Sequence, residues 1–167
     1  MTHTERPDFI RNVQTGLRSV GTGDRKATGN PLGRDLGLTR LGIHYEIVPP
    51  GNRTSFPHAE SHEEEFVLVL KGTPDVWIDG TLHELVEGDA VAFPAGTGIA
   101  HSFLNNSTGD VHLLVVGEAN KPENRISYPV DPERMQQYVA KGLGWTDVPS
   151  RTRGPHPGQA IAGTRKV

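Results

Sequence analysis

Short apolar segments separated by turns dominate the middle of this chain. Between residues 41 and 116, apolar and polar side chains alternate with the two-residue period of β-strands that have one face against a core. The predicted strands cover residues 41–48, 55–60, 64–70, 75–78, 81–85, 90–93, 101–104 and 111–116. Turn sequences separate them, and one of these turns, Asp79-Gly80, is typical of a β-hairpin. The pattern predicts an all-β fold, an antiparallel sandwich or barrel.

The segments on either side of these strands have a different character. Residues 1–38 are polar and rich in glycine, so we expect an N-terminal arm that packs on the domain or on a partner subunit. After the last strand, Asp131 followed by Pro132 is typical of a helix start and predicts a short helix at about 131–141. Trp145 is expected to anchor the irregular tail on the barrel. The chain is therefore divided into an arm at 1–38, a barrel at 39–118, and a helix with an irregular tail at 119–167.

Composition narrows the possible ligands and partners. The 167 residues suit one domain, and the absence of cysteine means that any metal must be held by histidine and carboxylate. The net charge of -3 argues against nucleic acid as a partner. No segment has the apolar run of a signal peptide or a membrane span, so we expect a cytoplasmic protein without a membrane partner. The cations near the C-terminus are expected to be solvated and to hold an anion only weakly: Arg151, Arg153, Arg165 and Lys166.

Histidines and glutamates gather just before the predicted strand at 64–70. In an extended segment His58, Glu60 and His62 share one face. A turn follows at Glu63 and Glu64, whose side chains are expected to be solvated, and Glu65 can then return to the face of His58 and Glu60. So many imidazoles and carboxylates repel one another or compete for solvent unless a cation or a set of hydrogen-bond donors gathers them. The segment therefore predicts a metal site.

Two spaced motifs in this chain resemble the motifs of the cupin superfamily. The matching residues are Gly51, His58, Glu65 and Gly72 for the first motif, and Gly88, Pro94, Gly96, His101 and Asn105 for the second. The chain departs from the pattern at Glu60, where the superfamily usually has a second histidine, and in having four residues instead of two between Gly96 and His101. The resemblance implies a single-domain cupin jelly-roll barrel with a polar N-terminal arm and a short C-terminal helix.

The resemblance also implies a divalent metal ion and a set of ligands. The implied ligands are His58, Glu60, Glu65 and His101, with His62 as the alternative to Glu60. The chemistry of a nitrogen and oxygen shell does not distinguish Zn, Mn, Fe, Ni or Co, although a second carboxylate favours a harder ion. A pocket that binds no metal and works by shape and hydrogen bonds stays open as a further alternative. His44 and His112 are weaker candidates for lining the cavity.

Together, the motifs and the resemblance predict a small metal-binding cupin enzyme that acts on a small oxygen-bearing organic substrate. Its reaction type, whether dioxygenase, isomerase or lyase, is not resolved, and any carboxylate that is not a ligand is the candidate base. The alternative is a non-catalytic cupin module that binds a small ligand. Cupins often form homodimers through edge strands, and here the arm and the outward-facing Phe66, Leu68 and Leu70 are the expected contacts.

Overall fold

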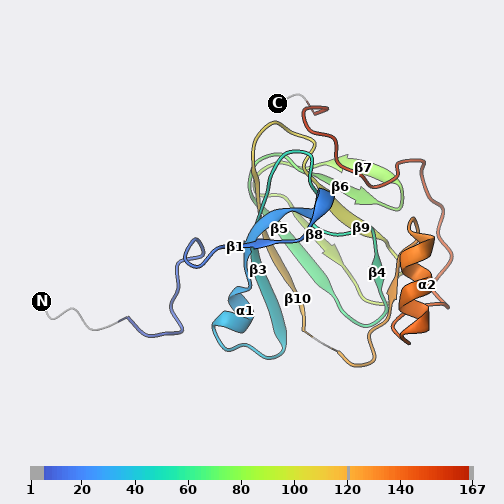
Figure 1. Cartoon of the computed structure of the whole chain (residues 1–167), viewed down its shortest axis with the longest axis horizontal. Coiled ribbons are helices and arrows are strands. Elements are labelled where there is room, and N and C mark those ends of the chain that lie inside the picture. Colours follow the sequence, from blue (N-terminus) through green and yellow to red (C-terminus); the bar gives the residue numbers. More distant parts are fainter. Residues whose placement is uncertain (1–5, 120, 166–167) are drawn as a thin grey trace, which may run out of the picture.

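The computed structural model describes residues 6–119 and 121–165 and confirms the all-β fold (Figure 1). In chain order the elements are β1 (Arg18–Val20), the 3-10 helix η1 (Gly23–Arg25), β2 (Ala27–Asn30), α1 (Leu32–Asp35), β3 (Leu41–Val48), β4 (Ala59–Glu60), β5 (Glu65–Lys71), β6 (Asp75–Ile78), β7 (Thr81–Glu84), β8 (Ala90–Phe93), β9 (His101–Leu104), β10 (Val111–Glu118), β11 (Ile126–Ser127) and α2 (Pro132–Ala140). None of the described helices has the length and apolar run that crossing a membrane requires.

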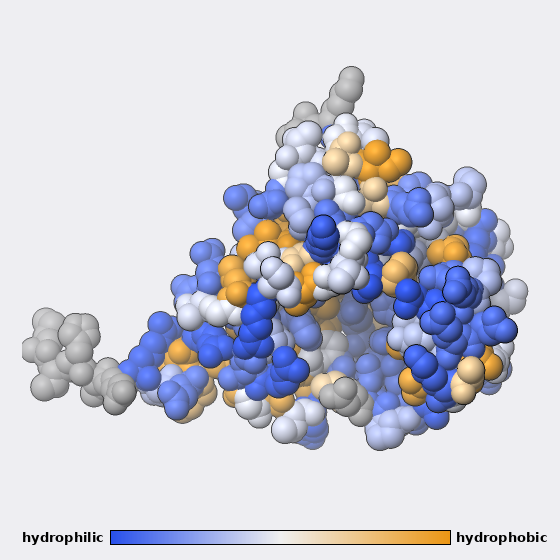
Figure 2. Space-filling model, viewed as in Figure 1, coloured by the Kyte–Doolittle hydropathy of each residue, from blue (hydrophilic) through white to orange (hydrophobic). Residues whose placement is uncertain are grey.

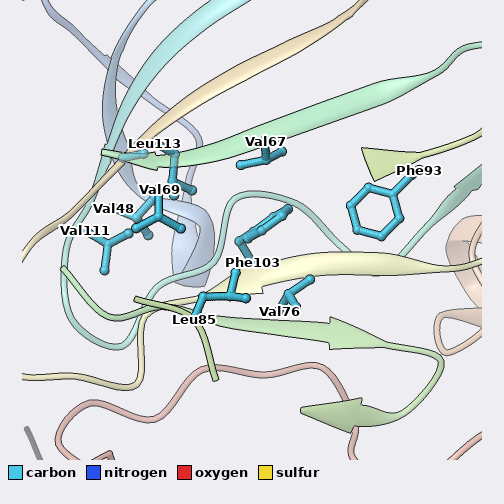
Figure 3. Close-up of a cluster of buried hydrophobic side chains, with 10 residues drawn as sticks. Val48, Val67, Val69, Val76, Leu85, Phe93, Phe103, Val111 and Leu113 are labelled. Carbon is cyan, nitrogen blue, oxygen red and sulfur yellow. The ribbon is translucent and has the colours of Figure 1, made fainter. Parts of the chain in front are cut away.

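The strands form antiparallel sheets that enclose one main core. The largest sheet has the order β1-β2-β3-β10-β5-β8, a second has the order β7-β6-β9, and β11 pairs with β4. Side chains from the two larger sheets meet between them (Figure 3). The larger sheet and the smaller sheet both contribute buried residues to this cluster, among them Val48, Val67, Val69 and Leu113 from the first and Val76 and Phe103 from the second. The fold is thus a jelly-roll barrel of the predicted kind.

Local sequence explains the strand and helix ends that were predicted well. On β5, Val67 and Val69 are 1% exposed, which is the inward face that the alternating pattern predicts. The turn after β6 contains Asp79 and Gly80, both with positive φ, as a two-residue hairpin loop requires. The Asp131 side chain accepts a hydrogen bond from the backbone N–H of Arg134 and caps α2, confirming the predicted helix.

Two segments of the chain differ from the predicted strands. The arm contributes β1 and β2, which extend the large sheet beside β3 through pairs such as Thr28 with Ile47. Their polar, glycine-rich sequence has no alternation, so only pairing with a neighbour defines them as strands. The strand expected at 55–60 is reduced to β4, because Pro57 has no N–H to donate to a ladder.

The C-terminal tail packs on the outer face of the smaller sheet. Trp145 is buried in a second apolar cluster with Trp77 and Leu104, so the predicted anchor is confirmed. The indole N–H of Trp77 also donates to the backbone carbonyl of His156, at 2.8 Å. An aromatic anchor therefore joins the tail to β6 and β9.

The expectation of solvated cations in the tail is wrong for Arg165. Its guanidinium lies 3.2 Å from the carboxylate of Asp75, and both side chains are nearly buried. Arg151 is also paired, with a carboxylate in the turn after β6. Arg153 is exposed, as expected, and Lys166 lies outside the described residues. The tail sequence has few apolar residues and does not show that Arg165 would be buried. Its burial depends on the buried carboxylate of Asp75 on β6, which needs a cation as partner.

Candidate functional site

His58 and His101 lie side by side although 42 residues separate their positions in the sequence. Their backbones form a two-way bridge, in which His58 N–H donates to His101 O at 3.2 Å and His101 N–H donates to His58 O at 2.9 Å. The ring centroids are 5.0 Å apart. His101 begins β9 and His58 immediately precedes β4, so the barrel brings the two cupin motifs together at one place.

Glu65 reaches the same place from the large sheet. It begins β5 and pairs across the sheet with Phe93 of β8. The Phe93 ring stacks on the His101 imidazole with centroids 3.5 Å apart, and this contact orients the imidazole. The Glu65 carboxylate oxygen Oε1 lies 3.2 Å from His101 Nε2. Three of the predicted ligands, His58, Glu65 and His101, are therefore neighbours in the structure.

Both imidazoles have Nδ1 directed at a backbone carbonyl. His58 Nδ1 lies 2.9 Å from Phe56 O, and His101 Nδ1 lies 3.4 Å from Ile99 O. If each Nδ1 carries the proton and donates it to that carbonyl, each Nε2 has a free lone pair, which is the usual state of a histidine that binds a metal. The backbone thus favours the tautomer that a metal ligand needs at His58, whereas at His101 the Glu65 carboxylate competes for a proton on Nε2.

The contact between His101 and Glu65 has two chemical explanations. A neutral His101 cannot donate from Nδ1 to Ile99 O and from Nε2 to Glu65 at once, because it carries one proton. Either Nε2 carries a proton, in a neutral or a doubly protonated ring, and donates it to the carboxylate, or Nε2 and the carboxylate oxygen are both ligands. Two ligand atoms at about 2.0–2.1 Å from one tetrahedral ion lie about 3.3 Å apart, which agrees with the 3.2 Å found here. The donor set therefore fits a divalent ion.

The remaining predicted residues are distributed around this pair of imidazoles. Glu60 lines the same small cavity as Glu65 and His101, and its carboxylate accepts a long hydrogen bond from Asn124, at 3.4 Å. His62, the alternative to Glu60, is exposed, and its ring Nδ1 contacts the hydroxyl of the preceding Ser61 at 2.7 Å. The structure thus brings Glu60, and not His62, to the cavity.

The two glutamates expected in a solvated turn behave differently. Glu64 is exposed, as predicted. Glu63 is half-buried, lines the cavity with Glu60, and accepts a 2.7 Å hydrogen bond from the backbone N–H of Lys121. The prediction is wrong for Glu63, because the segment after β10 folds back over this turn.

The electrostatics of the cavity favour a neutral His58 imidazole and an ionised Glu65. Burial, with the neighbouring charge of His101, lowers the pKa of His58 to about 4. Burial opposes ionisation of Glu65, but the hydrogen bond from His101 and the nearby imidazoles outweigh it and lower the pKa of Glu65. Burial and the like charges of Glu63 and Glu65 raise the pKa of Glu60 to about 7. A bound cation would reverse this last effect and favour the ionised carboxylate.

Two further residues of β3, Glu46 and His44, lie close enough to Glu65 to be affected by its charge, and the sequence pattern indicates little about either. Glu46 pairs across the sheet with the fully buried Leu113, so both belong to the inner face of the barrel. Burial and the charge of Glu65 raise the pKa of Glu46 to about 7. His44, two residues earlier, lines the adjoining cavities. Their spacing of two and four residues from Val48 places them on the same strand face as this apolar residue. That spacing alone does not show whether the face is buried at their positions.

Other candidate positions have structural roles. His112 accepts or donates a 2.6 Å hydrogen bond with the Tyr45 hydroxyl, away from His58 and His101. Asn105 donates to the carbonyls of Val48 and Gly109 and so fastens the turn after β9. Within residues 6–119 and 121–165, no three His, Asp or Glu side chains converge, as they stand, closely enough to hold an ion.

In the space-filling view the molecule is hollowed between the N-terminal strands and α2, and hydrophilic residues surround the hollow (Figure 2). The cavity at the hollow's N-terminal side is lined by residues of β2, α1 and β3. This cavity shares no lining residue with the small cavity of Glu60, Glu65 and His101, and the polar side chains of His44 and Glu46 lie in its lining.

Comparisons with known proteins support the cupin fold. A family model described as a cupin domain matches residues 44–117. Among curated proteins, quercetin 2,3-dioxygenase of Bacillus subtilis is 29% identical over 129 residues. That alignment covers 75% of this chain, but the chain spans only 38% of the length of the dioxygenase.

Two solved structures are also similar. A putative sugar phosphate isomerase from Acidithiobacillus ferrooxidans has 26% identity and a TM-score of 0.67, covering 73% of this chain and 81% of that one. A sugar phosphate isomerase described as a member of the cupin superfamily, from Silicibacter pomeroyi, has 31% identity and a TM-score of 0.60, covering 66% of this chain and 73% of that one.

Proposed function

This chain belongs to the cupin superfamily, and we propose that it is an enzyme that uses a divalent metal ion to act on a small oxygen-bearing organic substrate. The observation that carries the proposal is the proximity of His101 to both His58 and Glu65, with both imidazoles directed through Nδ1 at backbone carbonyls. The similar proteins bear the names of an isomerase and a dioxygenase, so the proposal extends to the chemistry of the site and not to one reaction.

The chain supplies the metal shell from three strands and one loop. His58, Glu65 and His101 would hold the ion, and Glu60 is the fourth ligand that the cavity offers. When bound, the ion supplies a Lewis acid that polarises a carbonyl or hydroxyl oxygen of the substrate. Phe93 keeps water from one face of His101 by stacking on it.

Glu46 is the group we propose for proton transfer. It faces the inside of the barrel from β3, near Glu65, and it is not one of the proposed ligands. A carboxyl group with a pKa of about 7 can both accept and return a proton near neutral pH. His44 lies on the same face of β3, and the charge of Glu65 affects its pKa. It lines the cavity beside the site, where it can contact a substrate.

Metal analysis with matched histidine variants tests the proposal. Protein purified without added ions, and protein incubated in turn with zinc, manganese, iron(II) and nickel and then dialysed, is analysed for its elements. We expect about one ion per chain in the wild type and less than about 0.1 in His58→Ala. His83→Ala removes an exposed imidazole of β7 and is the control that keeps the ion. A wild-type protein that retains no ion under any of these conditions, or a His58→Ala variant that retains it fully, contradicts the proposal.

We also propose that two copies pair through the outer face of the large sheet. Phe66 and Leu70 are 40% and 38% exposed there, and Leu68 lies half-buried between them. Large exposed apolar side chains of this kind favour association. Light scattering should give twice the 18.1 kDa mass, and Phe66→Glu with Leu70→Glu should give the monomer. A wild-type monomer at all concentrations would refute the pairing.

A further inference from the structure

The N-terminal segment forms one wall of a cavity that lies beside the site, against the inward-facing residues of β3. Residues of β2, η1 and α1 lie outside the range 44–117 that matches the cupin domain, yet they line a cavity together with His44 and Glu46. The cavity has a volume of about 320 Å³, within the range of about 300–1,000 Å³ found for small-molecule sites. Arg25 and Arg34 are the two cations in its lining.

These two arginines differ from most others in how their charge is compensated. In the described part of the chain, neither guanidinium forms an ion pair or hydrogen bond, and the Nε atom of Arg25 is buried without a partner. Arg25 is held in place by the Phe56 ring, whose centroid lies 4.3 Å from the guanidinium carbon. By contrast, six arginines do pair with carboxylates: Arg11, Arg18, Arg53, Arg134, Arg151 and Arg165.

The one carboxylate in the cavity does not offset this charge at neutral pH. Glu46 lies in the lining, but burial and Glu65 raise its pKa to about 7, so much of it is uncharged there. Burial also lowers the pKa of His44, and the positive charge of Arg34 contributes to that shift. His44 is therefore mostly neutral, and the uncompensated charge of the cavity belongs to the two guanidiniums.

We propose that Arg25 and Arg34 bind an anionic oxygen group of the substrate, a phosphate or a carboxylate. The inference rests on the proposed function for the reacting end of the substrate, which lies at His58, Glu65 and His101. His44 lies between the two places: it lines the cavity with Arg34, and it is near enough to Glu65 for that carboxylate to affect the pKa of the imidazole. A guanidinium binds either anion through two parallel N–H donors, which explains why arginine stands here.

The position of Arg34 makes the proposal easy to test without disturbing the fold. Arg34 is exposed on a short helix and Arg40, six residues later, is exposed on the same segment but is not among the residues lining the cavity. Arg34→Gln and Arg25→Gln each replace one charged guanidinium with a neutral amide, and Arg40→Gln is the matched control. The probes are D-glucose 6-phosphate, D-gluconate and D-glucose, which share a six-carbon hydroxylated chain and differ in their anionic group.

Calorimetric titration of each probe decides the question. We expect at least one of the two anions to bind the wild type at least about tenfold more tightly than glucose, and Arg34→Gln and Arg25→Gln each to weaken that binding about tenfold or more. Arg40→Gln should bind as the wild type does. Binding of glucose 6-phosphate alone assigns a phosphate, and binding of gluconate alone assigns a carboxylate.

The outcomes separate this inference from the proposed metal function. If neither anion binds better than glucose, or if anion binding is the same in Arg34→Gln and Arg25→Gln as in Arg40→Gln, the inference is overturned even in a protein that holds its ion. If the anion binds through the arginines while the wild type holds no metal, the metal proposal fails and the anion site stands. Measuring metal content in the same preparations distinguishes the two cases.

Discussion

The arginines of the C-terminal tail and those of the cavity show how differently one fold can use the same side chain. Arg165 donates to Asp75 and to the backbone carbonyl of Pro74, and Arg151 pairs with Asp79 at 2.5 Å. Each of these carboxylates is buried on or beside β6. A buried carboxylate without a cation is costly, so the tail arginines stabilise the barrel.

The cavity has the opposite balance of charge. Arg25 and Arg34 face it without a carboxylate partner in the described chain, and Glu46 lies in it with its ionisation opposed by burial. Such groups contribute little or negatively to folding and persist where a ligand uses them. The paired arginines of the tail therefore have a structural role, and the two cavity arginines keep the unpaired charge that binding an anion requires.

Among substitutions that test this difference between the two regions, Arg165→Ala is expected to change the free energy of unfolding most. Arg165→Ala leaves Asp75 buried with only Asn106 as a side-chain donor, so we expect a loss of about 2–4 kcal/mol in the free energy of unfolding. Urea denaturation at pH 7 measures it, with Arg153→Ala, an exposed arginine of the same tail, as the control. A loss below about 0.5 kcal/mol would show that the tail pairing is no more important than a surface ion pair.

A smaller effect of opposite sign is expected at Glu46. Its pKa is about 7 in the folded protein and lower in the unfolded chain, so the folded state binds more protons between these values and stability falls as the pH rises through this window. Glu46→Gln should remove the part of that decline that Glu46 causes, leaving the part due to Glu60, and should raise stability at pH 8 by about 1–3 kcal/mol, with less effect at pH 5. Urea denaturation of metal-free protein across this range provides the test. An unchanged pH profile in Glu46→Gln would show that Glu46 ionises as freely as an exposed carboxyl.

The smallest effect is expected at Arg34. Because it has no partner among the described residues, Arg34→Gln should change the free energy of unfolding by less than about 0.5 kcal/mol while it weakens anion binding. A large destabilisation would place Arg34 with the tail arginines. The contrast between the two regions would then fail at this position.

Most of the barrel and part of the site could be predicted from sequence. Strands such as β6 and β9 lie between glycine, proline and asparagine turns, so the predicted bounds 75–78 and 101–104 match the structure. The motif spacing also identified the neighbours His58, Glu65 and His101. These signals are local or repeat at short intervals.

The parts that escaped prediction depend on distant contacts. β2 becomes a strand because it pairs with β3, not because its own residues Ala27–Asn30 favour one. Glu46 lies on a strand in which apolar and polar residues alternate, and the sequence does not show whether its side chain faces solvent or the inside of the barrel. Arg25 is recognisable as a cavity residue only once η1 is folded beside β3. In each case the structure or environment of the residue depends on a segment that is distant in the sequence.

The most direct test of the account is anomalous scattering from crystals of protein loaded with a single divalent metal. The account predicts one strong peak within ligand distance of His58, His101 and Glu65, with both Nε2 atoms directed at it and both Nδ1 atoms at the carbonyls of Phe56 and Ile99. Crystals of loaded protein with no peak there, and with His101 Nε2 still hydrogen-bonded to Glu65, would contradict it.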